Sequence, residues 1–330
     1  MNFDTVTVRV GEADTAVDIT VYRDVLSAVS PYFRSAFEGP FVEATDRSIS
    51  LTDVTEQTFR MFLQWAHSQK CQLSNGAAFP QHGILVQKST RKNMEQTTTG
   101  SAELQLPLRT SSSPNAETMP DTTAAIDEHD DYDDHRSMVT KALGQLYHAN
   151  PEWIHGYRLS LLSFLRLYIF ADKYNVPQLR DDILTAMIAQ SHAWNWWPDI
   201  ERELMKSAYA NLPPSSKFIR LLVLSTAYCW LLEPETCSAT RMRTMMEMNA
   251  EFAFEVIVVQ NQMLKNSRSS GGLPLWLEDA VPDSCTLHEH LVQDAAQCRK
   301  RIRDQSHILT GLIEMCAADV VGITKESGEE

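Results

Sequence analysis

The fold is decided by a stretch near the N-terminus that reads Asp18-Ile-Thr-Val-Tyr-Arg-Asp-Val-Leu-Ser-Ala-Val-Ser-Pro-Tyr-Phe-Arg-Ser-Ala-Phe-Glu-Gly-Pro-Phe-Val-Glu43. Its beginning alternates between apolar and polar side chains, with Val17, Ile19 and Val21 on one face. This period of two residues is typical of a half-buried strand. Over residues 25–29 the apolar side chains follow a helical spacing instead. The stretch therefore predicts a strand followed directly by a short helix.

A second helix is predicted to begin at Ser30-Pro31. A serine hydroxyl can cap the first amide groups of a helix, and a proline at the first helical position loses no hydrogen bond. Phe33 and Phe37 lie four residues apart, so they share one face of this helix. Gly39-Pro40 then ends it, because neither residue favours continued helix. The stretch therefore predicts the order strand, helix, break and helix.

The residues on either side extend this pattern into a small α/β unit. Residues 5–10 predict a strand that pairs with the strand ending at Tyr22 to form a hairpin, and residues 47–51 predict a third strand. Next, Asp53 is expected to cap a helix over residues 55–67, with Glu56 three positions later completing a capping box.

The middle of the chain has a different composition. Ser, Thr, Gln, Asn and Pro dominate residues 71–136, and an acidic run occupies residues 127–134. A segment with so few apolar side chains cannot bury enough surface to offset the entropy of ordering it. We therefore predict a disordered insertion, in which the acidic run is a solubilising segment rather than a site.

Helical periodicity resumes beyond the insertion. Residues 159–174 predict a helix, and Asn175 and Pro177 mark a break after it. In the following helix, apolar side chains recur every four residues from Leu179 to Met187. Two consecutive helices with a short connection are therefore expected here.

The stretch at residues 18–43 resembles the start of a BTB/POZ domain. The string Leu167-Tyr-Ile-Phe-Ala-Asp-Lys-Tyr-Asn-Val-Pro-Gln-Leu179 resembles the closing helix pair of the same domain, and residues 208–222 resemble the C-terminal half of fungal BTB proteins. The resemblance implies an α+β fold, in which a small sheet with helices is interrupted by the insertion and followed by an α-helical C-terminal region. Loop-closure entropy rises slowly with length, so an insertion of this size is tolerable.

This interpretation divides the chain into four parts. They are a first BTB/POZ part at residues 1–70, the low-complexity acidic insertion at 71–136, the closing helices at 137–190 and the α-helical region at 191–330. Within the last part we expect helices over residues 240–266 and 287–315.

The resemblance implies a non-enzymatic protein-interaction module that forms homodimers, with the apolar first strand and the exposed parts of the first helix contributing to the dimer. It further implies a substrate adaptor for a cullin-type ubiquitin ligase. In BTB families that bind a cullin, a hydrophobic-x-acidic triplet follows the second helix, and Phe41 and Glu43 match it. The alternative is that Phe41 covers the core of its own domain and Glu43 is solvated.

A second candidate site lies just before the first helix. BTB domains usually carry a histidine there, whereas this chain has Tyr22, followed by Arg23 and Asp24. Tyr22 and Asp24 are therefore the candidate pocket residues. The alternative is that Asp24 caps the helix or forms a local ion pair.

Four residues near the C-terminus form a candidate metal-ligand set: Cys285, His288, His290 and Cys298. Two thiols and two imidazoles suffice for tetrahedral zinc, and fungal relatives by resemblance carry a similar cluster. Against this, the spacing is uncommon, and histidines two apart on a helix point in different directions. The sequence therefore predicts no cofactor and favours scattered structural cysteines and surface histidines, with a zinc site as the alternative.

Composition narrows the functions further. The formal charge of −14 opposes direct binding to nucleic acid or to an anionic membrane. The N-terminus has no signal-like apolar run, no apolar run is long enough to span a bilayer, and no Cys-x-x-Cys pair occurs, which together predict a cytoplasmic or nuclear protein. Common catalytic motifs are missing from the sequence, so we expect no enzyme activity.

Two other functional classes stay open from the sequence. One is a nuclear transcriptional regulator or corepressor-binding BTB protein, with the basic run at residues 299–303 as its nuclear address. The other is a zinc-dependent activity at the Cys/His cluster.

Overall fold

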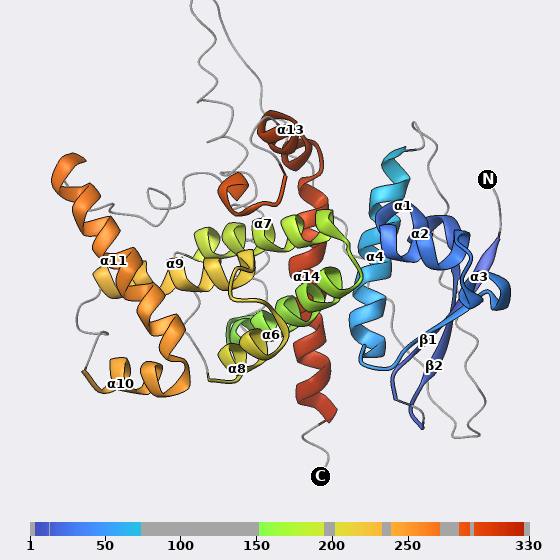
Figure 1. Cartoon of the computed structure of the whole chain (residues 1–330), viewed down its shortest axis with the longest axis horizontal. Helices are drawn as coiled ribbons and strands as arrows, with labels where there is room; N and C mark the ends of the chain where they lie inside the picture. The colour runs from blue at the N-terminus through green and yellow to red at the C-terminus, as the bar shows by residue number, and fades with distance from the viewer. Residues whose placement is uncertain are drawn as a thin grey trace, which may run out of the picture.

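The structure is a computed structural model that describes residues 4–12, 14–73, 152–194, 202–232, 239–270, 284–290 and 294–326. Its elements form a small sheet with helices at the N-terminus and a helical remainder (Figure 1). This arrangement confirms the predicted α+β class. Apart from the helical residues 71–73, the insertion predicted at 71–136 lies outside the described residues.

The sheet has three strands in the order β2-β1-β3. β1 (Thr5–Val10) pairs antiparallel with β2 (Val17–Tyr22) and parallel with β3 (Ser48–Leu51). Gly11, at the turn of the hairpin, has a φ of +102°, a conformation that strongly favours glycine. The predicted hairpin and third strand are both confirmed.

The position of β1 changes the argument for a homodimer. β1 is the central strand of the sheet, and its apolar side chains Val6, Val8 and Val10 are buried in the core. Its two edges are both occupied by neighbouring strands. The apolar face of the first strand therefore offers no surface to a second copy, and homodimerisation loses that support.

The helices α1 (Arg23–Val29), α2 (Pro31–Glu38) and α3 (Val42–Asp46) follow β2. As predicted, the Ser30 hydroxyl caps α2 by accepting a hydrogen bond from the Phe33 amide at 3.2 Å. The side chains of Phe33 and Phe37 are buried on the inner face of α2. Burial of this face fixes the orientation of the whole α2–α3 segment.

The predicted cap of the next helix, α4 (Glu56–Leu73), is wrong. Thr55 is the capping residue, because its hydroxyl accepts a hydrogen bond from the Thr58 amide at 3.2 Å. The carboxylate of Asp53 instead binds Lys173 Nζ at 2.6 Å. Asp53 thus binds Lys173, 120 residues later in the sequence, instead of capping the helix as its local spacing predicted.

α6 (Glu152–Lys173) and α7 (Pro177–Trp194) pack onto the N-terminal elements. The Ser30 hydroxyl donates to the Tyr174 carbonyl oxygen at 2.6 Å, and the Phe33 and Tyr174 rings stack with centroids 5.6 Å apart. The predicted break between the helices is confirmed at Asn175, whose φ is +49°. Segments on either side of residues 71–136 therefore share one core, although the domain boundaries themselves stay predictions.

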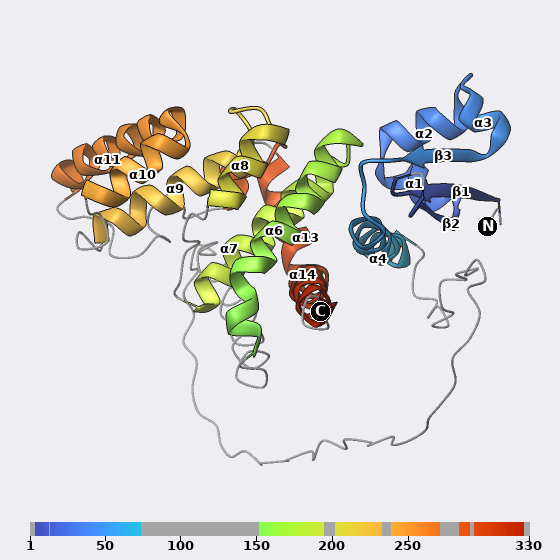
Figure 2. The ribbon, with the colours of Figure 1, turned by 90° about the horizontal axis from the view of Figure 1, so that it is seen from below.

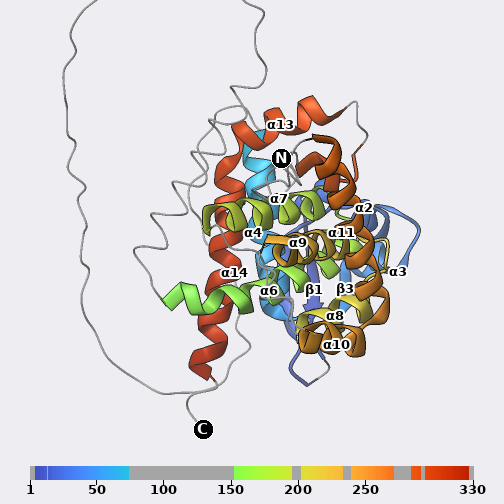
Figure 3. The same cartoon turned by 90° about the vertical axis from the view of Figure 1, so that its left-hand side faces the viewer.

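Four helices follow α7, of which the first packs against α6 and the other three extend to the end of the molecule away from the sheet (Figures 1 and 3). They are α8 (Arg202–Asn211), α9 (Lys217–Leu232), α10 (Ala239–Met248) and α11 (Ala250–Ser270). The helical structure predicted over residues 240–266 is confirmed, and Asn249 divides it into α10 and α11. Its side chain accepts a hydrogen bond from the Phe252 amide at 3.0 Å and so starts a new helix.

The C-terminal segment returns to the centre of the molecule. A single 3₁₀ turn, η1 (Ser284–Leu287), is followed by α13 (Ala295–Asp304) and α14 (Ser306–Glu326). α14 contacts α4, α6 and α7, and Figure 2 shows it end-on between α6 and α4. The helical structure predicted over residues 287–315 is confirmed in α13 and α14, which Gln305 separates, but it is wrong at residues 288–290, which form a bend. Within the described ranges, no helix is both long and apolar enough to cross a membrane.

Candidate interaction surface and candidate metal centre

The residues between α2 and α3 form an exposed apolar projection, which we call the Phe41 tip (residues 39–43). Phe41 precedes α3 in an extended conformation, and its carbonyl oxygen accepts a hydrogen bond from the Ala44 amide at 3.2 Å. The side chains of Phe41 and Val42 are 54% and 65% exposed. None of the residues of α3 is buried. The tip therefore presents two adjacent apolar side chains to solvent.

The backbone holds the Phe41 tip in place. A Cβ atom at Gly39 would lie 2.4 Å from the Ser35 carbonyl oxygen and 3.1 Å from the Phe41 ring, so only glycine fits there. After α3, Arg47 adopts a left-handed conformation with a φ of +51°, and its guanidinium binds Asp4 at 2.9 Å. These constraints at both ends fix where the tip projects, although it buries little surface of its own.

Phe41 and Glu43, the two residues of the tip predicted from the sequence, differ in their exposure to solvent. The Phe41 ring lies against Gly39 and remains half exposed, which disagrees with the alternative that it covers the domain core. Glu43 is half-buried in the first turn of α3. An apolar group flanked by a carboxylate is chemically suited to an apolar groove with a basic rim.

The other candidate pair, Tyr22 and Asp24, lies at the junction of β2 and α1. The side chain of Tyr22 is 43% exposed and makes no capping hydrogen bond to α1. The Asp24 carboxylate lies 3.9 Å from the Arg23 guanidinium, which in turn binds Asp4 at 3.2 Å. The local ion pair considered for Asp24 is therefore present, whereas a pocket at these residues stays a prediction.

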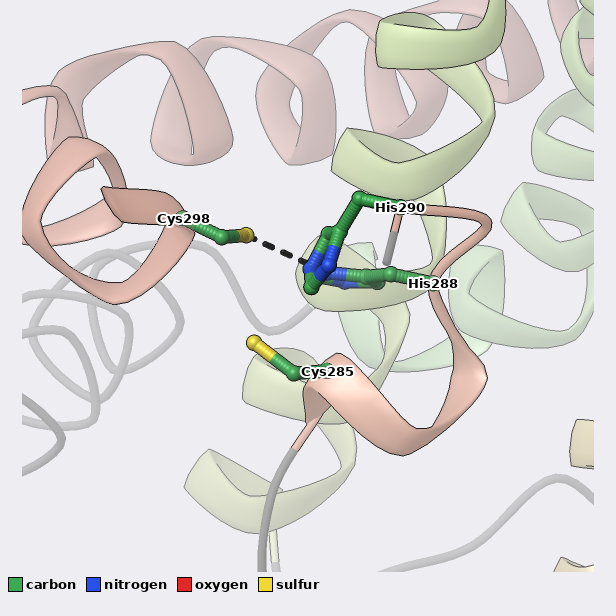
Figure 4. A group of neighbouring side chains, drawn as sticks. All are labelled: Cys285, His288, His290 and Cys298. Atoms are coloured by element: carbon green, nitrogen blue, oxygen red, sulfur yellow. Dashed lines mark hydrogen bonds between the residues drawn. The ribbon is translucent and has the colours of Figure 1, made fainter. Parts of the chain in front are cut away.

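The four candidate metal ligands come together in space. Cys285 lies in η1, His288 and His290 lie in the bend after it, and Cys298 lies in α13. Their ligand atoms are all within 4.8 Å of one another, and Figure 4 shows the side chains converging. The objection that a helix would separate the two imidazoles is wrong, because residues 288–290 are not helical. We call these four residues the Cys/His centre.

Distances within the Cys/His centre are short. His288 Nδ1 is 3.3 Å from Cys298 Sγ and 3.3 Å from His290 Nε2. His288 is only 4% exposed, and the other three residues are half-buried. A hydrogen bond from Cys285 lowers the pKa of the Cys298 thiol to about 4, and the nearby imidazoles act in the same direction against the cost of burial. Cys298 is therefore expected to be a thiolate at neutral pH.

Side chains of α7 hold the bend at residues 288–290. The Thr185 hydroxyl oxygen lies 2.8 Å from His288 Nε2. Asp181 Oδ1 accepts a hydrogen bond from the Glu289 amide at 3.0 Å, and Arg180 Nε donates to Glu289 Oε1 at 2.8 Å. The loop is thus fixed through both its backbone and its side chains.

A second anchor lies on the α13 side of the Cys/His centre. The Arg301 guanidinium forms a bidentate pair with Asp182 at 2.5 and 2.7 Å, and the Trp65 indole donates to the same carboxylate at 2.9 Å. The Asp182 side chain is 2% exposed and that of Arg301 19%. The pair was not predicted from the sequence, since no local signal connects residues 119 positions apart. It also places the central arginine of the basic run 299–303 inside the structure.

Comparison with known proteins identifies one domain. The family model described as "BTB/POZ domain" matches residues 2–88. Two curated relatives, both called "Kelch repeat and BTB domain-containing protein 8", come from Xenopus tropicalis and Danio rerio. Each is 31% identical over 63 residues, which cover 19% of this chain and 10% of the relative, so the chain spans about a tenth of the length of these proteins. No solved structure matches.

Proposed function

We propose, on the premise that this chain carries a BTB/POZ domain, that the protein is a non-enzymatic adaptor that presents a client to a cullin-type ubiquitin ligase. A BTB/POZ domain is a protein-interaction module, so binding to other proteins is the coarse function of the N-terminal part. The finer role depends on which surface meets the partner. The observation that carries our proposal is the exposure of Phe41 and Val42 at a fixed tip.

The energetics favour the Phe41 tip as a contact point. Burying a phenylalanine side chain completely contributes about 1.5–3 kcal/mol, and about half of this remains available because Phe41 is half exposed. Fixing the tip beforehand also reduces the entropy lost on binding. Such a preorganised aromatic residue has the properties of an interface hot spot.

Glu43 is proposed to orient the contact rather than to supply most of its affinity. A carboxylate at the rim of an interface contributes mainly to the association rate and to selection of a basic partner surface. Glu43 lies two residues from Phe41, and part of its side chain remains exposed. Both side chains can therefore contact the same partner. We therefore expect a partner groove that is apolar at its centre and basic at its edge.

The helical half is proposed to recognise the client. Phe254, Ile257 and Val258 of α11 are 66%, 36% and 49% exposed. Their spacing of three and four residues places them on one face of the helix. In Figure 1 this helix lies at the opposite end of the molecule from α3, which would keep a client and a ligase scaffold apart.

The nuclear-regulator hypothesis has less structural support. Arg301, in the middle of its basic run, is engaged by Asp182 and Gln69. A nuclear localisation signal needs charged side chains that are accessible to a receptor. The Arg301 side chain is only 19% exposed. Cytoplasmic or nuclear location and homodimerisation stay proposals.

A binding experiment tests the adaptor proposal. The full chain is immobilised, and retention of a purified cullin N-terminal scaffold is compared between the wild type and the double variant Phe41→Ala, Glu43→Lys. The matched control is Phe254→Ala, Glu255→Lys, which makes the same chemical change on α11, where Phe254 is even more exposed. Circular dichroism establishes that both variants are folded.

We expect the wild type and the control to retain the scaffold and the tip variant to lose it. Failure of the wild type to bind would contradict the adaptor role. Equal binding by the tip variant would contradict the assignment of the contact to Phe41 and Glu43. Partner capture by the tip without cullin binding would move the corepressor-binding class ahead.

A further inference from the structure

We propose that Cys285, His288, His290 and Cys298 bind one Zn²⁺ ion that fixes the C-terminal segment onto α7. The four ligand atoms converge from η1, the following bend and α13, all within 4.8 Å of one another. Two thiolates and two imidazoles in a tetrahedral arrangement are a donor set that selects zinc among the common divalent ions.

The hydrogen bonds around His288 select the tautomer that a metal requires. The Thr185 hydroxyl donates its only proton to the Asp181 carbonyl oxygen at 3.0 Å. The same oxygen lies 2.8 Å from His288 Nε2 and can then only accept, so Nε2 must carry the imidazole proton. In a neutral imidazole the lone pair is then on Nδ1, the atom that faces Cys298 and His290. An outer hydrogen bond of this kind is the usual support of a metal-bound histidine.

The observed spacings match the edges of a zinc tetrahedron. Bond lengths of about 2.3 Å to sulfur and 2.0–2.1 Å to nitrogen place neighbouring ligand atoms about 3.3–3.8 Å apart. The two distances from His288 Nδ1, to Cys298 Sγ and to His290 Nε2, are both 3.3 Å. A small contraction around an ion would bring the remaining pairs from within 4.8 Å into the same range.

Hydrogen bonds alone satisfy this arrangement poorly. In the tautomer fixed by Thr185, His288 Nδ1 has one lone pair, yet both Cys298 and His290 approach that atom. One lone pair accepts at most one well-directed hydrogen bond, so Nδ1 cannot be hydrogen-bonded to both neighbours, and His288 is too buried for water to compensate freely. A central cation satisfies all four ligand atoms at once.

The predicted role of the ion is structural. Four protein ligands complete a tetrahedron and leave no open position for a water molecule or a substrate, which a catalytic zinc requires. The arrangement therefore opposes the zinc-dependent activity considered from the sequence. It favours a clamp that joins the bend at residues 288–290 to α13.

The clamp lies between two ion pairs that already bind this segment to α7. Arg180 holds Glu289 on one side, and Asp182 holds Arg301 on the other. Through the Trp65 indole, the second pair also reaches α4 in the N-terminal part. Zinc would therefore stabilise the docking of the C-terminal segment, including α14, on helices distant from it in the sequence.

Metal content tests this proposal directly. The full chain is purified under reducing conditions without chelators or immobilised metal, and zinc is measured per chain by elemental mass spectrometry. We expect about one zinc ion per chain in the wild type and less than about one tenth of that in Cys298→Ser and in His290→Ala. The matched control Cys229→Ser, whose thiol is half-buried in α9 outside the centre, should keep the wild-type content.

A second measurement needs no variant. After zinc is removed by chelation, cobalt(II) is titrated into the reduced wild type, and visible absorption is recorded. Tetrahedral thiolate coordination gives intense d–d bands and sulfur-to-metal charge transfer, which we expect to saturate at about one equivalent. A wild type that is purified without zinc and gives no tetrahedral cobalt spectrum would overturn the proposal, as would equal zinc in the wild type and both cluster variants.

Discussion

The Phe41 tip and the Cys/His centre differ in which kind of side chain they expose to water. At the tip, apolar groups face water, although the backbone around Gly39 and Arg47 holds them firmly. At the centre, polar groups are withdrawn from water and face one another. We propose that a protein partner covers the apolar groups at the tip and that a cation binds the polar groups at the centre.

The comparison shows that the type of a residue does not decide its role. Its burial decides whether it stabilises the fold or is available for contact with a partner. Phe33 and Phe41 lie eight residues apart, yet the first is fully buried and the second half exposed. The same contrast exists among ion pairs. Asp182 and Arg301 are almost enclosed, whereas Asp53 and Lys173 are each about half exposed. Substitutions within these pairs test the contrast between buried and exposed side chains.

The largest expected difference is between the two phenylalanines. The Phe33 ring stacks on Phe37, Phe62 and Tyr174, so Phe33→Ala should lower the free energy of unfolding by about 3–5 kcal/mol. Phe41→Ala should change it by less than about 0.5 kcal/mol, because the ring contributes little to the core. Urea denaturation followed by circular dichroism measures both. Equal losses in the two variants would mean that the tip is a structural element after all.

Next in size is the buried ion pair beside the Cys/His centre. Asp182→Ala removes the partner of Arg301 and the acceptor of the Trp65 indole, and should cost about 3 kcal/mol. Asp182→Asn is the matched control, since it keeps the shape and one acceptor oxygen and should cost less. Thermal denaturation compares the two variants with the wild type. A change below about 1 kcal/mol in Asp182→Ala would show that the C-terminal segment does not depend on this anchor.

A smaller effect is expected from the residue that orients His288. Thr185→Val removes the hydroxyl that fixes the imidazole and should weaken zinc binding about 10-fold. Thr226→Val is a close control, because Thr226 is also a buried helical threonine whose hydroxyl donates to a carbonyl oxygen four residues earlier, at Leu222. Competition with a chromophoric chelator gives both affinities. Equal affinities in the two variants would contradict the outer-ligand role of Thr185.

The smallest effect concerns the exposed ion pair. Partial burial opposes the shift, but the hydrogen bond from Lys173 lowers the pKa of Asp53 below its usual value of 3.8. The stabilisation is therefore complete above that value and is lost as the pH falls through the lower, folded-state pKa. Because both side chains are about half exposed and screened, it should amount to less than about 1 kcal/mol. Asp53→Asn should reduce the loss of stability at acid pH, measured by thermal melts over a pH series. An unchanged pH dependence would contradict a stabilising role of the Asp53–Lys173 pair.

Local pattern predicted the N-terminal fold well. The alternation around Ile19, the Ser30 cap and the break at Asn175 each depend on residues close in sequence, and the structure confirms all three. The Asp53 cap failed for the opposite reason, because a lysine far along the chain binds its carboxylate. Local rules hold where no tertiary partner competes.

The C-terminal segment shows where prediction from sequence stops. Residues 287–315 contain enough apolar side chains to suggest helical structure, and that assumption separated His288 from His290. The actual bend depends on Arg180, Asp181 and Thr185, which are more than 100 residues earlier in the chain. The ligand types were visible in the sequence, but their convergence was not.

The tip was found from sequence only through the hydrophobic-x-acidic resemblance. Spacing identified Phe41 and Glu43, whereas exposure, which decides whether Phe41 is a contact or a core residue, required the fold. Gly39 carried the only local signal, a helix-ending Gly-Pro pair, but its close approach to the Phe41 ring was not predictable.

The most direct test of the account is the dissociation constant for the cullin scaffold, measured by calorimetry with the full chain and with Phe41→Ala, alongside the zinc content of both samples. We expect Phe41→Ala to weaken binding about 10–100-fold, which corresponds to the loss of about 1.4–2.8 kcal/mol typical of truncating an aromatic hot spot, and to leave the zinc content unchanged. Unchanged affinity in Phe41→Ala, or no measurable binding by the wild type, would contradict the assignment of the Phe41 tip as the partner surface.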